Sequence, residues 1–440
     1  MDPGWLGSYN RNIFITRKAL DRLAKIKHTL DMQGKSEYIF RYLEKALRKL
    51  IKKRYSALIL GPRQVGKTTT VSKCLEDVGN TIEYPLQDPS VRIELEANPS
   101  RIIGQVQAQK GRPYLFIDEA QKIPKIFDAV QFLIDNKNAQ CILTGSSARK
   151  LRRHGVNLLP GRVKYFHMDP LAWGELGLVK ENNILPIKTA NINKKGDYSF
   201  EEVLVYGSLP GIACLPERER KDFLKSYANI YLEEEIRAEA LSRKIGAFSR
   251  FLELAAAGSG SSPNFTKLSN EAGVSQPAIK EFYRILEDTL IVERVDPYLK
   301  SARKRILSSS RYYFFDIGVR NALARVPLTR RSINAQKGVV FEHAVMLEII
   351  RRIRILNKNY RVCYWRTSGG AEVDCVIDLG NAIIPIEIKS SASVALSEIK
   401  GLKSFLDDYK KTAKHGYVIT MGNRKEKLSD NITALPWSCL

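Results

Sequence analysis

The sequence predicts an α/β fold built around a parallel sheet, and three observations carry this prediction. Short apolar runs at 56–60, 114–118 and 141–145 alternate with helical stretches, which is typical of a sheet covered by helices on both faces. The first run leads directly into a glycine-rich loop of phosphate-binding pattern. A second series of helical and apolar segments runs from residue 337 to the end. We therefore place the sheet core at residues 51–180 and a second α/β domain at 337–440.

Length and composition describe a folded protein of several domains. The chain has 440 residues, of which 44% are hydrophobic and 27% charged, as in globular proteins. At roughly 100–200 residues per domain, two to four domains are expected. No uncharged apolar run approaches the ~18 residues of a membrane span, and the first residues lack the apolar region of a signal peptide. We therefore expect a cytoplasmic protein without a membrane partner. The six cysteines are scattered with no C-x-x-C pair, which argues against a zinc ribbon or a disulfide framework.

The net charge of +24 is concentrated in three parts of the chain. Residues 1–56, 301–336 and 337–440 carry +9, +7 and +5, so the region between the first two is almost neutral. Basic flanks around a neutral centre are typical of a protein that binds a polyanion, and they predict DNA as a partner. The alternative is a solvated, highly charged surface such as thermophilic proteins carry. The clustering favours DNA.

The pattern of apolar residues divides the rest of the chain. Residues 17–53 read as two amphipathic helices, and 1–50 are assigned to a basic N-terminal region. Residues 181–300 are expected to form a helical lid and a winged helix-turn-helix, followed by a basic connector at 301–336. Within residues 181–300, a predicted helix ends in a turn at Gly273, and a second helix begins at Ser275. The strand-like segment LIVERV follows this second helix. The second helix offers only Lys280 and Arg284 as bases, so a structural lid and a DNA reader both stay open.

A phosphate-binding loop lies between the first apolar run and a helical stretch. Its sequence fits G-x-x-x-x-G-K-[ST] at every fixed position. The glycines let backbone N–H groups turn toward phosphate oxygens, while a lysine and a hydroxyl serve the β/γ phosphates and Mg²⁺. The predicted ATP-binding residues are Gly61, Pro62, Arg63, Gln64, Val65, Gly66, Lys67, Thr68 and Thr69, with Thr68 also a Mg²⁺ ligand.

Two further apolar runs end in polar residues that suit ATP hydrolysis. Asp118 and Glu119 follow YLFI, where the first is expected to hold Mg²⁺ through water and the second to polarise the attacking water. The run ending at Thr144 and Ser146 predicts a γ-phosphate sensor, with Thr144 as first choice. Arg162 is read either as an arginine finger or sensor, or as an ion pair unrelated to phosphate.

Four residues of the C-terminal region have the spacing of a metal-dependent nuclease. Asp374 and Glu387 lie on neighbouring predicted strands, and Lys389 is two residues beyond Glu387 on the same side of its strand. The two carboxylates, with Glu342 from the preceding helix, are the predicted ligands of Mg²⁺ or Mn²⁺. Lys389 is expected to position water beside a scissile phosphate. The alternative is a salt-bridged sheet edge.

The order of these motifs resembles a known family. The P-loop, Asp118-Glu119, TGSSARKL, Pro160-Gly161-Arg162, YGSLPGI and IEIKSS follow one another as in AAA+ superfamily P-loop ATPases of archaea and bacteria that carry a C-terminal domain of unknown function. The resemblance covers nearly all of the chain beyond about residue 38. It implies an AAA+ core, a winged-helix segment and a restriction-endonuclease-like C-terminal domain of the PD-(D/E)XK type, related to archaeal Holliday junction resolvases.

Three functions are compatible with the sequence. The first is an ATP-hydrolysing protein that binds and processes DNA, including branched DNA, and whose C-terminal domain cleaves it. The second is a regulatory or defence ATPase switch whose nuclease-like domain binds without cutting. The third is an adaptor for protein partners in which the winged helix only packs. Homo-oligomerisation stays open.

Overall fold

The computed structural model describes residues 38–146, 159–179, 198–238, 245–299, 309–356 and 359–440. The chain divides into two compact units, Met1–Tyr38 and Ile39–Leu440. The first predicted helix of the basic N-terminal region and Arg303, Lys304 and Arg305 of the predicted connector lie outside the described residues.

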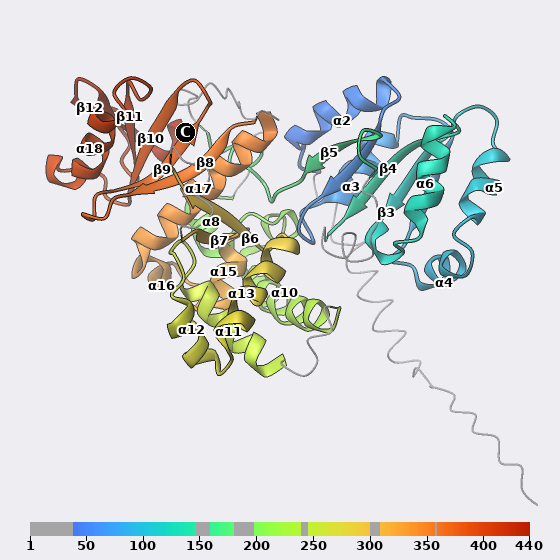
Figure 1. The fold of residues 1–440 in the computed structure, drawn as a ribbon, viewed down its shortest axis with the longest axis horizontal. Helices are drawn as coiled ribbons and strands as arrows, with labels where there is room; N and C mark the ends of the chain where they lie inside the picture. Colours follow the sequence, from blue (N-terminus) through green and yellow to red (C-terminus); the bar gives the residue numbers. More distant parts are fainter. Residues whose placement is uncertain (1–37, 147–158, 180–197, 239–244, 300–308, 357–358) are drawn as a thin grey trace, which may run out of the picture. The chain divides into compact units, whose positions relative to one another are not determined.

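A parallel five-stranded sheet forms the first part of this unit, in the order β2-β3-β4-β1-β5 (Figure 1). The three predicted strands are confirmed, and two unpredicted strands complete the sheet edges. Alternate residues of β1 face two separate apolar clusters, with Ala57 and Ile59 on one side and Leu58 and Leu60 on the other. The elements are α2 (Tyr42–Lys52), β1 (Ser56–Leu60), α3 (Lys67–Leu75), β2 (Thr81–Pro85), α4 (Pro89–Ala97), α5 (Arg101–Gln107), β3 (Tyr114–Asp118), α6 (Ile126–Asp135), β4 (Gln140–Gly145) and β5 (Val163–His167).

Helix α2 belongs to this sheet domain and not to a separate N-terminal region. Leu47, Leu50 and Ile51 are buried in the same apolar cluster as β1. The buried guanidinium of Arg41, at the helix N-cap, donates to the Val65 carbonyl oxygen at 2.6 Å. The domain boundary, which was predicted at residue 50, therefore lies on the N-terminal side of α2 and not on its C-terminal side.

The middle of the chain is mainly helical. Its helices are α8 (Phe200–Tyr206), α9 (Pro210–Ala213), α10 (Glu217–Ala238), α11 (Ile245–Ala257), α12 (Phe265–Ala272), α13 (Gln276–Asp288), α15 (Ile317–Leu323) and α16 (Arg330–Asn334). Helices α12 and α13 are joined by a turn in which Gly273 has φ +70°. Ser275 occupies the N-cap of α13 with extended backbone, although its side chain makes no capping hydrogen bond. The predicted helix-turn-helix positions are thus helical.

The strand-like segment after α13 joins the sheet of the C-terminal region. Strand β6 (Val292–Pro297) pairs antiparallel with β7 (Arg311–Phe314) and parallel with β8 (Arg361–Arg366). Residues 309–336, predicted as part of a basic connector, are therefore folded into β7, α15 and α16. Two of their basic side chains, Arg311 and Arg320, are buried. For residues 309–336 the prediction of a basic connector is therefore wrong, because part of the positive charge of these residues is paired inside the protein.

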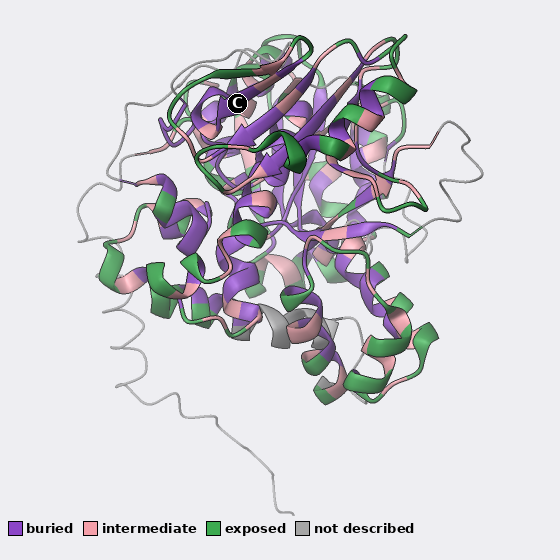
Figure 2. Ribbon diagram, turned by 90° about the vertical axis from the view of Figure 1, so that its left-hand side faces the viewer, coloured by how far each residue is buried: buried purple, intermediate pink, exposed green. Residues whose placement is uncertain are grey.

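The C-terminal region completes a mixed eight-stranded sheet of order β12-β13-β11-β10-β9-β8-β6-β7 (Figure 1). Its elements are α17 (Lys337–Leu356), β8, β9 (Glu372–Asp378), β10 (Ile383–Lys389), α18 (Lys400–Asp408), β11 (Gly416–Thr420), β12 (Glu426–Ser429) and β13 (Ile432–Pro436). Apolar residues of α17 share one cluster with Cys375 and Ile377 of β9, whereas those of α18 share another with Val376. The two helices therefore cover opposite faces of the sheet. Figure 2 shows that buried residues gather in the strands.

Two glycines, Gly207 of the YGSLPGI motif and Gly318 of α15, allow α8 and α15 to approach each other closely. A Cβ at Gly318 would lie 2.1 Å from the Tyr206 carbonyl oxygen, and one at Gly207 would lie 2.0 Å from Asp316 Oδ1. The Asp316 carboxylate accepts hydrogen bonds from the Ser208 backbone N–H at 2.7 Å and from that of Val319 at 3.1 Å. The close approach requires the absence of a side chain at both positions.

We expect Gly318→Ala to destabilise the protein. The added methyl group meets backbone atoms that cannot move independently, so the free energy of unfolding should fall by about 1–3 kcal/mol. Gly104→Ala is the matched control, because nothing lies within 4 Å of a Cβ there. Alanine in the middle of α5 should instead stabilise the protein by about 0.5–1 kcal/mol. Denaturant unfolding of both variants measures the difference, and equal stabilities would contradict the packing described.

Candidate functional site

The P-loop runs from the end of β1 to the start of α3. Gly66 is the N-cap of α3 with φ +91°, a conformation that favours glycine. A Cβ at Gly61 would lie 2.2 Å from the Met168 carbonyl oxygen, so this position also excludes a side chain. The loop therefore turns its backbone toward the N-terminus of α3, where N–H groups are available to phosphate.

The Lys67 ammonium is buried inside the loop. Its Nζ donates to the carbonyl oxygens of Gly61 at 2.9 Å and Pro62 at 2.8 Å. Glu119 Oε1 lies 3.9 Å away. Burial lowers the pKa of Lys67, while Glu119 and Asp118 act in the opposite sense. The nearby carboxylates keep a cation favourable where phosphates are expected.

Asp118 lies between two hydroxyl groups. Thr68 Oγ1 donates to its carboxylate oxygens at 2.9 and 3.0 Å, and Thr144 Oγ1 donates to Asp118 Oδ1 at 2.5 Å. The carboxylate is almost completely buried. An aspartate and a threonine hydroxyl in contact form an oxygen donor set that suits Mg²⁺. The structure thus brings Thr68, Asp118 and Thr144 together as predicted.

Glu119 has an unusual backbone and several partners. Its φ of +56° is left-handed, which is rare for a residue with a side chain. Its Oε2 accepts from Ser146 Oγ at 2.9 Å and closely from Gln121 Nε2. Burial opposes ionisation, but Lys67 and these two hydrogen bonds hold the pKa of Glu119 below its usual value. The carboxylate is therefore ionised at neutral pH, as a base for water requires.

Sequence reasoning missed Gln121 and Arg41. Gln121 is buried and also donates to Ser146 Oγ at 2.9 Å, so it links the second predicted sensor position to Glu119. Its only signal was its position two residues after Glu119. Arg41 holds the P-loop at Val65 and contacts Glu175 Oε2 at 3.1 Å. No motif marked it.

The remaining predicted loop residues lie around the same turn. Gln64 has φ +61°. The Arg63 carbonyl oxygen accepts from Tyr227 Oη at 3.4 Å, which joins the loop to α10. Arg63 is also close enough to affect the pKa of Glu119. Thr69 is exposed on the first turn of α3.

Arg162 does not lie at this site. It precedes β5, whose first residue, Val163, pairs with Ser56 at the beginning of β1, whereas the P-loop follows the end of β1. Its Nε lies 2.6 Å from Asp135 Oδ1 at the C-terminus of α6. Arg162 is therefore not in place to act as a phosphate sensor in its own chain. The ion-pair alternative describes the observed geometry.

The predicted residues of the C-terminal region meet at the junction of β9, β10 and α17. Lys389 Nζ donates to Glu387 Oε1 at 2.7 Å, as expected for residues two apart on a strand. Asp374 Oδ2 accepts from the Ile388 backbone N–H at 2.8 Å. Glu342 on α17 interacts electrostatically with both other carboxylates. We call Glu342, Asp374, Glu387 and Lys389 the tail cluster.

The tail cluster brings three carboxyl groups together beside one lysine. Burial, followed by the nearby Asp374, raises the pKa of Glu342 to about 7 and that of Glu387 to about 8. Burial likewise raises the pKa of Asp374. Glu387 Oε2 is buried, and no hydrogen-bond donor among the described residues reaches it. A divalent cation would satisfy this oxygen and neutralise the cluster.

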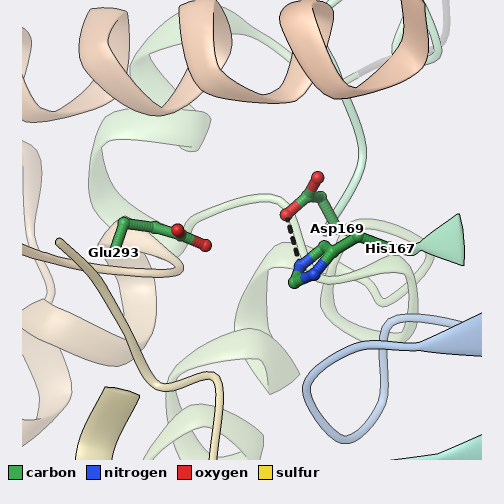
Figure 3. A group of neighbouring side chains, drawn as sticks. All are labelled: His167, Asp169 and Glu293. Carbon is green, nitrogen blue, oxygen red and sulfur yellow. Dashed lines mark ion pairs between the residues drawn. The ribbon is translucent and has the colours of Figure 1, made fainter. Parts of the chain in front are cut away.

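One group of three ligand atoms within 4.8 Å was not predicted. Among the described residues, it consists of His167, Asp169 and Glu293 (Figure 3). Arg354 Nη1 lies 2.7 Å from Asp169 Oδ1 and 2.8 Å from Glu293 Oε1, so a cation is already bound between the carboxylates. Despite burial, Arg354 and His167 hold the pKa of Asp169 well below its usual value. The tail carboxylates are spaced more widely than this group, and a metal ion would have to draw them together.

Comparisons with known proteins agree with the geometry of the first site. Residues 53–177 match the family described as AAA domain. Residues 197–330 and 337–440 match two families described as domains of unknown function, DUF8612 and DUF4143. The first match begins after α2, and the second includes β6 and β7, which pair within the sheet of the C-terminal region.

Relatives and solved structures add little about function. Uncharacterized proteins of Mycobacterium bovis and Mycobacterium tuberculosis are each 23% identical over 398 residues, covering 89% of this chain and 82% of their own. A Walker-type ATPase of Pyrococcus abyssi is 14% identical with a TM-score of 0.44, covering 66% of this chain and 97% of its own. The Aeropyrum pernix ORC1 protein, solved in complex with DNA, is also 14% identical but has a TM-score of 0.27, over 68% and 96%. Scores this low do not establish a shared overall fold.

The described part of the chain contains no helix that is long and apolar enough to span a membrane. Its parallel sheet, P-loop and acidic strand end agree with the match of residues 53–177 to the family described as AAA domain.

Proposed function

We propose that this protein hydrolyses ATP and uses it in an action on DNA. The observation that carries the first half is the contact of Thr68 and Thr144 with Asp118, directly beside Glu119 and Lys67. The proposed ligands are ATP and Mg²⁺. When bound, Mg²⁺ would neutralise negative charge on the phosphates. ATP turnover by the full chain, with Mg²⁺ and with or without DNA, tests this proposal.

Each residue of the first site has a proposed role. Lys67 binds the β/γ phosphates, and Thr68 and Asp118 hold Mg²⁺. Glu119 orients and polarises the attacking water, kept in place by Gln121 and Ser146. Thr144 is the proposed sensor of the γ-phosphate, since its hydroxyl contacts both Asp118 Oδ1 and, at 3.0 Å, the Glu119 backbone N–H.

Proposed DNA binding rests on charge and exposure. The chain is strongly basic outside its centre. Lys267, Lys280 and Arg284 on α12 and α13 are exposed, which suits contact with phosphates by the proposed winged helix. Since few of these side chains can read bases, we propose sequence-tolerant binding.

DNA affinity should depend strongly on salt. Log affinity should fall linearly with log salt concentration, by about 0.9 for each phosphate neutralised on duplex DNA. Removing residues 1–37, or replacing Arg303, Lys304 and Arg305 by glutamine, should flatten the slope. The deletion stops before α2 because that helix packs in the core. Replacing the exposed Lys110, Lys125 and Lys137 of the neutral centre is the control. Binding that salt does not change would favour the adaptor.

For the tail cluster we propose a divalent-metal-dependent nuclease site. The buried Glu387 Oε2 without a donor, next to two further carboxylates, is the observation that supports it. The order α17-β8-β9-β10-α18-β11, with helices on both faces, suits the restriction-endonuclease-like domain expected from the sequence. Lys389 would steady water and the charge that develops on the phosphate. A switch that binds DNA without cutting is the second candidate, favoured by the wide spacing of the carboxylates.

A further inference from the structure

Arg311 lies beside the tail cluster although it comes from the middle of the chain. Its Nη1 is 3.6 Å from Glu342 Oε1, and its Nη2 closely contacts Glu372. Its Cζ lies 4.5 Å from the centre of the Tyr364 ring. Stacking on the ring and contact with two carboxylates fix the plane of the guanidinium, which a flexible lysine could not reproduce.

Tyr313 approaches the same oxygen of Glu342 from the same strand. Residues 311 and 313 are two apart on β7, so their side chains point to one face. The Tyr313 hydroxyl donates to Glu342 Oε1 at 3.0 Å. One hydrogen bond and one ion pair therefore hold the same carboxylate oxygen, while no hydrogen bond within the described part of the chain reaches the other, Oε2.

We propose that Arg311 and Tyr313 are positioning residues of the tail site, which hold Glu342 Oε1 so that Oε2 can bind a divalent cation together with Asp374 and Glu387. This inference rests on the metal site proposed above. It means that the site is built from two regions: β7 supplies the residues that orient Glu342, and α17, β9 and β10 supply the ligands. A C-terminal region without the β6–β7 pair would lack this support.

The arrangement is typical of how proteins support metal ligands. A carboxylate ligand is usually held through its second oxygen, and removal of the holding residue costs about 10–100-fold in metal affinity or activity. If Arg311 and Tyr313 served only to stabilise the fold, their removal would leave metal affinity unchanged as long as the protein stayed folded.

The test is Mn²⁺ binding by the full chain without nucleotide, measured by calorimetry and by electron paramagnetic resonance. Tyr313→Phe removes the hydroxyl and keeps the ring, and Arg311→Lys keeps the charge but loses the planar fork. Each should weaken Mn²⁺ binding about 10-fold or more. For Arg311→Ala, added methylguanidinium should restore part of the affinity. Arg366→Ala is the matched control, because Arg366 also contacts Glu372, at 3.7 Å, but its side chain is 63% exposed.

The outcomes separate this inference from the proposal beneath it. If Asp374→Asn binds as much Mn²⁺ as wild type does, the proposed metal site is wrong, and the inference is wrong with it. If Asp374→Asn loses Mn²⁺ binding, but Tyr313→Phe and Arg311→Lys bind as tightly as wild type, the positioning role alone is overturned. Thermal unfolding of every variant shows whether it is folded. Weakened binding by both conservative variants, with Arg366→Ala within about twofold of wild type, supports the inference.

Discussion

Glu119→Gln is expected to keep ATP bound and to lower its turnover about 10²–10⁴-fold, the usual contribution of a general base. The amide fills the same space and still accepts from Ser146, while the contacts of Thr68 and Asp118 stay intact. Only the negative charge that polarises water is lost. Fluorescence titration measures nucleotide affinity, and phosphate release measures turnover. When both are measured on the same preparation, an effect on binding can be told apart from an effect on the chemical step.

Lys67→Ala completes the same experiment with a different expected pattern. The lysine charge faces phosphates in both the ground state and the transition state, so binding and turnover should both weaken. Glu76→Gln at the exposed end of α3 is the control and should behave like wild type. Wild-type turnover by Glu119→Gln would mean that another residue activates the water. ATP binding unaffected by Lys67→Ala would contradict the P-loop assignment.

The core strands were predictable because they are buried on both faces. β1, β3 and β4 are mainly apolar and are buried at every position. β2 and β5, which were missed, form the two edges of the sheet and are only partly buried. Thr81 and Glu83 in one and Lys164 in the other interrupt the apolar pattern. An edge strand is specified by its single neighbour, which a local pattern does not contain.

The site residues divide in the same way. Lys67, Asp118 and Glu119 belong to motifs whose chemistry requires fixed spacing, and the structure brings them together. Arg311 is 31 residues from Glu342 and 63 from Asp374, and nothing local distinguishes it from a solvated base. For Arg162 the sequence left a phosphate contact and an ion pair open, because its motif-like context does not encode the edge of the sheet at which it lies. Long-range pairing decides both positions.

The largest effect in the C-terminal region is expected from Asp374→Asn, which should abolish metal binding and DNA cleavage together. The amide oxygen can still accept from the Ile388 backbone N–H, so the fold should survive, but the charge for the cation is lost. Removing a residue that only orients a metal ligand lowers metal affinity or activity about 10–100-fold, and removing the ligand itself should lower them more. Asp374→Ala should behave alike, with some loss of stability.

Lys389→Ala should instead spare metal binding and slow cleavage, because the lysine contacts Glu387 and would act on water and phosphate. The assay compares labelled duplex, single-stranded and four-way DNA with Mg²⁺ or Mn²⁺, with Glu426→Ala on the exposed strand β12 as control. Neither tail variant should change ATP turnover without DNA, since the P-loop belongs to a different sheet. Equal cutting by wild type and Asp374→Asn would point to a contaminating nuclease. Metal binding without cutting by wild type would leave the tail as a DNA-binding element of an ATP-driven switch.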